Sequence, residues 1–173
     1  MWIQNFILRC QHFAALSTLT IQQLRTSGVW LGGLLHPEAF IIAMRQLVAQ
    51  ENGWSLNDVQ LNLVPLTTEQ FERCGEVLQE RKTAFLIHSL VLEGADWCDE
   101  GLVPSDGIRY PLDEVLFEWS CVKEKEEAMI QVPIYLNETR SQLLYVVDLK
   151  HVNTIPTEMW RERAVSIICW RQS

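Results

Sequence analysis

Hydrophobic residues recur every three or four positions in the first third of the chain and every second position further on. The clearest helical stretch covers residues 37–52. Its apolar positions are Phe40, Ile41, Met44, Leu47 and Val48. Pro37 suits the first helical turn, Glu38 suits the positive end of the helix dipole, and Gly53 is typical of a residue that ends a helix. The pattern therefore predicts a helix that begins at Pro37 and ends just before Gly53.

Two further segments precede this helix. Residues at helical spacing near the start are Trp2, Phe6, Cys10 and Phe13, and they predict a helix over 2–16. Residues 17–27 are rich in Ser, Thr and Gln and favour a connector or a weak second helix. The apolar run 28–35 contains three glycines, where a backbone can bend tightly. We interpret this run as a bend that places the next helix.

The pattern changes to that of strands from Val59 onward. Val59, Leu61 and Leu63 alternate with polar residues, which is the period of a strand with one buried face. Candidate strands, rich in branched and aromatic residues, cover 59–66, 83–92, 115–122, 128–136, 143–150 and 164–170. The polar links 123–127 and 137–142 are too short for crossover helices, so they predict antiparallel hairpins.

A six-stranded antiparallel sheet must close on itself or be covered to protect its edges. We therefore predict an α+β fold, in which N-terminal helices precede and cover an incomplete six-stranded antiparallel β-barrel. The change of period divides the chain into a helical part, residues 1–56, and the barrel, residues 57–173. Within the barrel, residues 67–82 allow a short helix, and residues 94–112 form the longest loop region.

Composition and charge narrow the function. The 173 residues are 48% hydrophobic and 21% charged, as expected of a folded domain. Residues 1–50 carry three arginines and one glutamate, a net charge of +2, whereas residues 51–173 carry 11 basic and 21 acidic residues, a net charge of −10. An acidic surface repels phosphate backbones, so we expect no nucleic-acid partner. No stretch reaches the roughly 20 apolar residues of a membrane span, so we expect no membrane contact.

Candidate chemistry is sparse. The glycine-containing run is followed by leucines instead of the lysine of a phosphate-binding loop, and the four histidines form no zinc motif. Asp96, Asp99 and Glu100 flank Cys98, but no histidine that could act as a base lies near, so solvated loop charge is the simpler interpretation. Five cysteines without a CxxC pair predict reduced thiols. We expect no cofactor, no metal and no catalytic residue.

Apolar residues near the start of the chain are candidates for contact with a partner. A short helix cannot bury a stripe of Trp2, Phe6 and Phe13 within itself, and Trp30 belongs to the neighbouring apolar run. We predict these four as contact residues and expect the chain to be part of a longer one. Without the rest of that chain, the stripe predicts self-association of the fragment.

Several segments are similar to the C-terminal region of cytoplasmic dynein heavy chains. They are GVWLGGLLHPEAFIIAMRQLVAQENGWSL at 28–56, LVLEGADW at 90–97, VPIYLNETR at 132–140, LLYVVDLK at 143–150 and RERAVSIICW at 161–170. The resemblance implies the last helices of that region followed by its incomplete antiparallel barrel. Positions that match as scaffold are Gly32, Gly33, Pro37, Glu38, Phe40, Arg45, Gln46 and Trp54. The pattern is weakest at 67–82 and 98–111.

The resemblance implies a non-catalytic, regulatory domain that packs on the AAA+ ring of the same heavy chain. It would tune the force and processivity of movement toward microtubule minus ends, while ATP hydrolysis would belong to other parts of the motor. Its partners would be that ring and, through the full-length chain, the other dynein subunits, without direct microtubule contact by this fragment. Its localisation would be the cytoplasm and the microtubule cytoskeleton.

An alternative from a different class is a small β-barrel that binds an apolar ligand, because closed antiparallel barrels can hold one inside. The two hypotheses differ in what fills the barrel. A cavity of a few hundred Å³ lined by strands 59–66, 83–92 and 115–122 would favour the ligand binder. Packed side chains between these strands would favour the motor domain.

Overall fold

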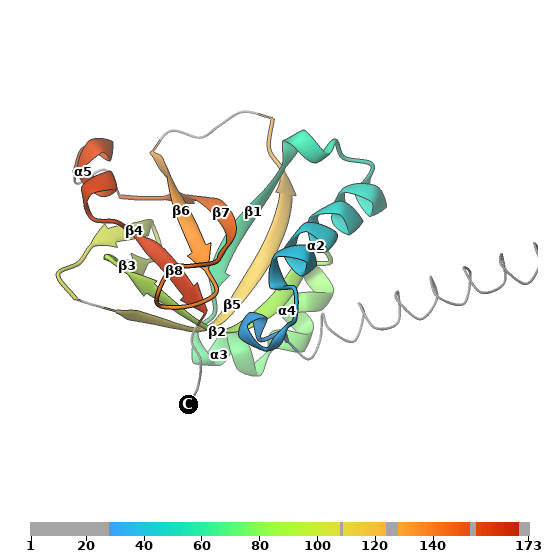
Figure 1. The fold of residues 1–173 in the computed structure, drawn as a ribbon. Coiled ribbons are helices and arrows are strands. Elements are labelled where there is room, and N and C mark those ends of the chain that lie inside the picture. Colours follow the sequence, from blue (N-terminus) through green and yellow to red (C-terminus); the bar gives the residue numbers. More distant parts are fainter. Residues whose placement is uncertain (1–27, 108, 124–127, 153–154, 170–173) are drawn as a thin grey trace, which may run out of the picture.

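The computed structural model describes residues 28–107, 109–123, 128–152 and 155–169 (Figure 1). A six-stranded sheet curls into part of a barrel, with the strands in the order β1-β5-β2-β8-β6-β7. The strands are β1 Val59–Pro65, β2 Ala84–Glu93, β5 Tyr110–Cys121, β6 Met129–Tyr135, β7 Leu143–Lys150 and β8 Ser166–Cys169. Each corresponds to a strand predicted from the sequence, so the α+β fold with an incomplete barrel is confirmed.

The helices surround this sheet. They are η1 Leu31–Gly33, α2 Pro37–Asn52, η2 Leu56–Asp58, α3 Thr68–Glu72, α4 Cys74–Glu80 and α5 Thr157–Glu162. The predicted bounds of α2 are confirmed, with Pro37 in its first turn and Gly53 at its C-terminal cap with a φ of 67°. None of the helices in the described part of the sequence is long and apolar enough to cross a membrane. The helix predicted over 2–16 and the connector predicted over 17–27 lie outside the described residues.

The expectation of a purely antiparallel sheet was wrong. β8 is antiparallel to β2 but parallel to β6, with Ile134 opposite Ile167 and Tyr135 opposite Ile168. A parallel neighbour requires a long connection. The chain provides one, because β7 and α5 both lie between β6 and β8. The short polar links identified from the sequence constrain only the strands that they join.

The expected long loop at 94–112 holds regular structure. A second small sheet consists of β3 Ala95–Cys98 and β4 Gly101–Pro104, which form a tight hairpin. β5 also begins earlier than predicted, at Tyr110, although Pro111 is its second residue. Pro111 is tolerated because this part of β5 pairs with β2 only, whereas pairing with β1 begins at Val115.

The sheet is covered on both faces by apolar clusters of different size. We call the larger one the main core; it includes Ile41 and Val48 of α2 and Phe85, Phe117 and Trp119 of the sheet. α2 contacts β1 and β7, the two edge strands of the sheet, and thereby covers the open side of the barrel (Figure 1). The outer cluster is Cys74, Leu78, Ala84, Leu86 and Leu116, in which α4 covers the opposite face of β2 and β5.

Candidate functional site

Large apolar side chains are exposed on the segment that leads into α2. The exposed fraction is 39% for Trp30, 94% for Leu35 and 47% for Ile42. On α2, exposed Ala39 and Ala43 lie within one turn of Ile42 and leave its side chain accessible. We call these five residues the N-terminal apolar face. Exposed apolar side chains that gather on one segment are candidates for an interaction site.

Strand-like alternation holds Trp30 outward. Val29 and Leu31 on either side are buried. The Val29 N–H donates to the Leu86 carbonyl at 2.8 Å, and the His88 N–H donates to the Val29 carbonyl at 2.9 Å. Val29 is therefore attached to β2 by two backbone hydrogen bonds, and Trp30 must point away from the core.

Two glycine contacts explain the bend at 28–33. A Cβ on Gly28, whose φ is +76°, would lie 1.8 Å from His88 Nε2. A Cβ on Gly33 would lie 2.6 Å from the Trp30 ring. The bend thus depends on backbone that approaches two aromatic rings more closely than any other residue allows. The predicted bend is confirmed, and Trp30 lies on it.

Polar contacts fix α2 relative to the barrel. The Arg45 guanidinium donates to the Leu56 carbonyl. Gln142, in the turn before β7, donates to Glu38 at 3.3 Å. The Trp54 N–H donates to the Ala49 carbonyl at 2.9 Å, just after the end of the helix. The first two contacts link α2 to η2 and to the turn before β7, and the third closes the C-terminal end of the helix.

Of the four predicted contact residues, only Trp30 can be placed. It is exposed on the N-terminal apolar face, as a contact residue must be. Trp2, Phe6 and Phe13 lie outside the described residues. Leu35 and Ile42 did not stand out in the sequence, because the helical period alone does not say which apolar positions of a short segment remain exposed.

The interior of the barrel is filled with side chains. Leu61, Phe85 and Phe117, from the three strands that would line a ligand cavity, are each at most 3% exposed and belong to the main core. A hollow of about 530 Å³ does open beside β1 and β7. Its lining includes the polar residues Gln60, Asn62, Gln131, Ser120, Asp148 and Lys150. This arrangement favours the motor-domain hypothesis over an apolar-ligand barrel.

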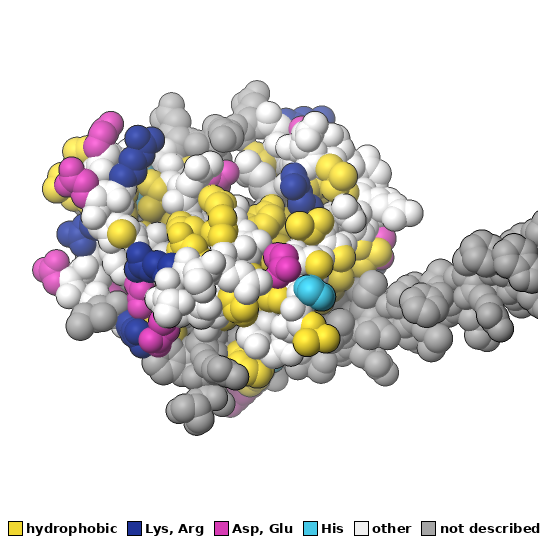
Figure 2. Space-filling view, viewed as in Figure 1, with side chains coloured by type: hydrophobic (Ala, Val, Ile, Leu, Met, Phe, Trp, Pro, Cys, Tyr) yellow, Lys and Arg dark blue, Asp and Glu magenta, His cyan; other side chains and the backbone are white. Residues whose placement is uncertain are grey.

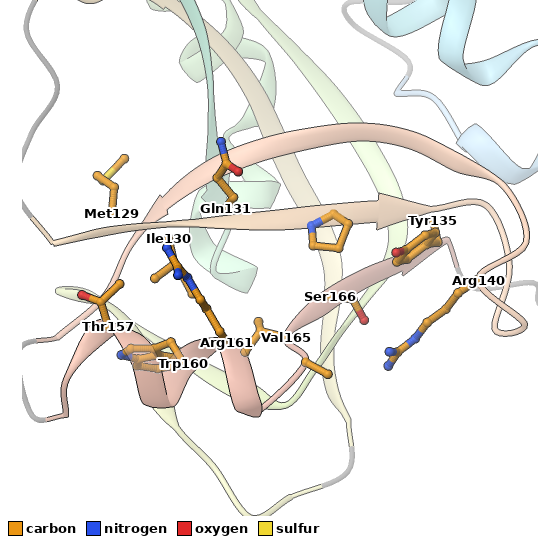
Figure 3. A pocket seen from close by; sticks show the side chains of 12 residues that line it. Met129, Ile130, Gln131, Tyr135, Arg140, Thr157, Trp160, Arg161, Val165 and Ser166 are labelled. Atoms are coloured by element: carbon orange, nitrogen blue, oxygen red, sulfur yellow. The ribbon is translucent and has the colours of Figure 1, made fainter.

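A second hollow was not foreseen from the sequence. It is a groove of about 460 Å³ between the outward side of β6 and the α5–β8 segment. Figure 3 shows Gln131 and Tyr135 on β6, and Trp160 and Arg161 on α5, around this groove. A sequence pattern could not reveal it, because the groove exists only where β8 stops pairing with β6.

Charged groups form structural links between strands. Glu93 is paired with Arg109 at 3.2 Å and with Arg140 at 3.0 Å, and Arg109 also pairs with Glu138 at 3.0 Å. The hydrogen bond with Glu138 raises the pKa of Arg109 further. The group connects the end of β2, the start of β5 and the β6–β7 turn. Figure 2 shows one face of the molecule. On that face, charged side chains gather near α5, whereas apolar side chains gather across the middle and toward α2.

The candidate acid–thiol group lies on the β3–β4 hairpin. Asp99 and Glu100 at its tip are exposed, and Cys98 is half-buried. Within the described ranges, no three His, Cys, Asp or Glu side chains come together in a way that could hold a metal ion. Burial raises the pKa of the Cys169 thiol to about 12, and burial followed by the charge of Glu114 raises the pKa of the Cys74 thiol. Such thiols are poor nucleophiles.

Comparisons with known proteins agree with this geometry. The family model for the C-terminal domain of the dynein heavy chain matches residues 1–169. The chain is 35% identical, over 99% of its length, to a cytoplasmic dynein heavy chain of Dictyostelium discoideum, and 34% identical, over 96%, to one of Drosophila melanogaster. It is 30% identical, over 80%, to the dynein beta chain of the flagellar outer arm of Chlamydomonas reinhardtii. The chain spans about 4% of the length of the two cytoplasmic relatives.

Proposed function

The chain belongs to the family of C-terminal domains of dynein heavy chains, and we propose that it packs on the AAA+ ring of its own heavy chain as a non-catalytic, regulatory domain. The match of the family model over residues 1–169 carries this proposal. In its terms, the domain tunes the force and processivity of movement toward microtubule minus ends. ATP hydrolysis occurs in other parts of the same motor.

The N-terminal apolar face supports the proposal of ring contact. Of its three large side chains, Leu35 is 94% exposed and would contribute about 1.5–3 kcal/mol if a partner buried it fully, whereas Trp30 and Ile42 are already partly buried and would each contribute less. They lie on a segment held by Val29 and on α2, so little conformational entropy is lost on contact. We propose that residues 1–56, with Trp2, Phe6 and Phe13, face the ring and that residues 57–173 face outward.

The acidic second part of the chain supports the proposed choice of partners. The net charge of −10 over residues 51–173 opposes contact with nucleic acid and with other acidic polymers. The partners in this proposal are the ring and, through the full-length chain, the other dynein subunits. The corresponding localisation is the cytoplasm and the microtubule cytoskeleton, in keeping with the names of the two cytoplasmic relatives.

Single-molecule motility of the full motor tests the regulatory role. We expect deletion of residues 57–173 to change stall force and run length while nucleotide turnover persists. Unchanged velocity, force and run length would contradict the proposal.

A pair of point variants separates ring contact from a general surface effect. In the full motor, Leu35→Ser combined with Ile42→Ser should alter run length, because both changes lie on the N-terminal apolar face. Leu143→Ser on β7 removes an apolar side chain whose exposure, 51%, is similar to that of Ile42, at a different place, and should leave run length unchanged. Equal effects of the two variants would show that ring contact does not involve this face.

A further inference from the structure

β8 is too short to cover both of its neighbours. On one side it pairs with Leu90–Glu93 of β2, and on the other it pairs only with Ile134 and Tyr135 of β6. β2 is nevertheless covered beyond β8, because Val29 bonds to Leu86 and His88 there. No described segment pairs in this way with β6 between Met129 and Gln131. Among the described residues, the edge of β2 beyond β8 is therefore covered, whereas the corresponding edge of β6 is open.

The backbone groups at the open edge can be identified from the hydrogen-bond phase of β6. The His151 N–H donates to the Ala128 carbonyl at 3.0 Å, and these two residues continue the β6–β7 register. Every second residue of an antiparallel strand bonds to the same neighbour, so Ile130 and Val132 bond to β7. Met129 and Gln131 therefore direct their N–H and C=O groups away from β7, into the side where β8 is absent.

Pro133 agrees with this phase. It lies opposite Val146, in the same set as Met129 and Gln131, so its missing N–H removes nothing from the β6–β7 ladder. Among the described residues, the backbone donors and acceptors of β6 that have no strand partner are thus those of Met129 and Gln131, next to the groove of about 460 Å³. An unpaired strand edge of this kind is a template for another extended chain.

The opposite wall of the groove offers an exposed cation, and two polar atoms behind this wall are buried and unbonded among the described residues. Trp160 Nε1 and Ser166 Oγ, on side chains at most 2% exposed, make no hydrogen bond within the described part of the sequence. Arg161 is exposed on α5, reaches toward β6 near Ile130 (Figure 3), and has no ion-pair partner among the described residues.

We propose that this groove binds an extended peptide segment with carboxylate side chains, which adds to the edge of β6 at Met129 and Gln131. The peptide backbone pairs with β6, and one of its carboxylates pairs with Arg161. The end of β8 is not a candidate occupant, since Ile168 lies beside Tyr135 and β8, parallel to β6, runs on from there away from Met129 and Gln131. This inference does not depend on whether the domain packs on a ring.

The test is fluorescence anisotropy with a labelled peptide of about six residues, the usual length of a strand, with alternating threonine and glutamate. The expected result is saturable binding with a dissociation constant below about 1 mM. A peptide with N-methylated amides on alternate residues has no N–H donors on one of its edges. If that edge faces β6, the peptide should bind at least about tenfold more weakly. Equal affinity of the N-methylated peptide, or no binding at about 1 mM, would overturn strand addition.

Three variants of the protein test the proposed contacts from its side of the groove. Gln131→Pro removes an N–H that faces the groove, as Pro133 already does in the same phase, and should weaken binding about tenfold. Gln131→Ala keeps that N–H and should bind nearly as the parent does. Arg161→Ala should weaken binding of the glutamate peptide several-fold but not of a glutamine analogue. Equal loss with both peptides would overturn the assignment of a carboxylate to Arg161.

Discussion

The main core and the outer cluster lie on opposite faces of the same strands and differ in how they are assembled. The main core joins α2 to the inner face of the sheet and includes residues from Val29 to Cys169. The outer cluster consists of five buried residues, and most of its covering comes from the short helix α4. One cluster joins distant parts of the chain, and the other depends on a local segment.

Because of this difference, we expect the two clusters to unfold with different cooperativity. Loss of any element from the main core exposes apolar surface on several others, so the core should unfold as one unit. α3 and α4 have five and seven residues, shorter than helices that are stable alone. They should therefore open without unfolding the barrel.

The largest effect should come from the main core. Phe117 is 2% exposed on β5, between Leu63 of β1 and Phe85 of β2. Phe117→Ala should lower the free energy of unfolding by about 3–5 kcal/mol, measured by urea denaturation. Phe71→Ala on α3 is the matched control, because Phe71 is 39% exposed and should cost under about 1 kcal/mol. Similar losses would show that the two faces do not differ.

A smaller effect is expected in the outer cluster. Leu78→Ala should cost about 2 kcal/mol, at the low end for buried leucines, because Leu78 is 8% exposed and α4 can shift toward the sheet. Hydrogen exchange should also accelerate in α4 but not in β5. Equal acceleration in both elements would mean that α4 unfolds only together with the barrel.

The next effect is a pH dependence of the free energy of unfolding, caused by the buried thiols of Cys169 and Cys74. Burial raises the pKa of Cys169 from 9.0 to about 12, so its thiol is neutral in both states below pH 9. Above pH 9 the unfolded chain loses this proton first, and stability should fall by about 1.4 kcal/mol per pH unit until the folded thiol ionises. Urea denaturation between about pH 8 and pH 10.5 should show a shallower fall for Cys169→Ala. Cys74→Ala should change the slope in the same direction but less, and equal changes would contradict the comparison.

The smallest effect on stability is expected at the N-terminal apolar face, which belongs to neither cluster. Ile42→Ser should change the free energy of unfolding by less than about 0.5 kcal/mol, because Ile42 is 47% exposed. It should nonetheless reduce concentration-dependent association in sedimentation experiments. Polar replacement of Trp2, Phe6 and Phe13 together tests the predicted stripe in the same assay. A parent chain that stays monomeric throughout would contradict the predicted self-association.

Much of the fold could be predicted because local signals agree with the tertiary contacts. Pro37 and Gly53 set the ends of α2, and period-two alternation located the six main strands. The parallel pairing of β6 and β8 could not be predicted, because it depends on a connection that includes another strand. The early start of β5 was obscured by Pro111, which is normally a sign against strand structure.

The candidate surfaces were harder to predict than the fold. Trp30 could be proposed from the sequence because it belongs to an apolar run next to the predicted stripe, and its contact role stays a prediction. The groove beside β6 was not, since it depends on where the short β8 ends its pairing, and strand ends are weakly encoded by local residues. The exposure of Leu35 likewise depends on how the bend after η1 meets α2.

The central position of β8 has a consequence for the order of synthesis. β1, β5 and β2 form one group of neighbouring strands, β6 and β7 form a hairpin, and β8 is the only strand of the described sheet that joins them. A ribosome adds about 5–20 residues per second and makes β8 last among these strands. From the time β7 is made until β8 is made, an interval on the order of seconds at this rate, the nascent chain therefore holds two unjoined sheets. Each has a hydrogen-bonding edge that β8 will later cover in part, and during this interval a chaperone would have the most to protect.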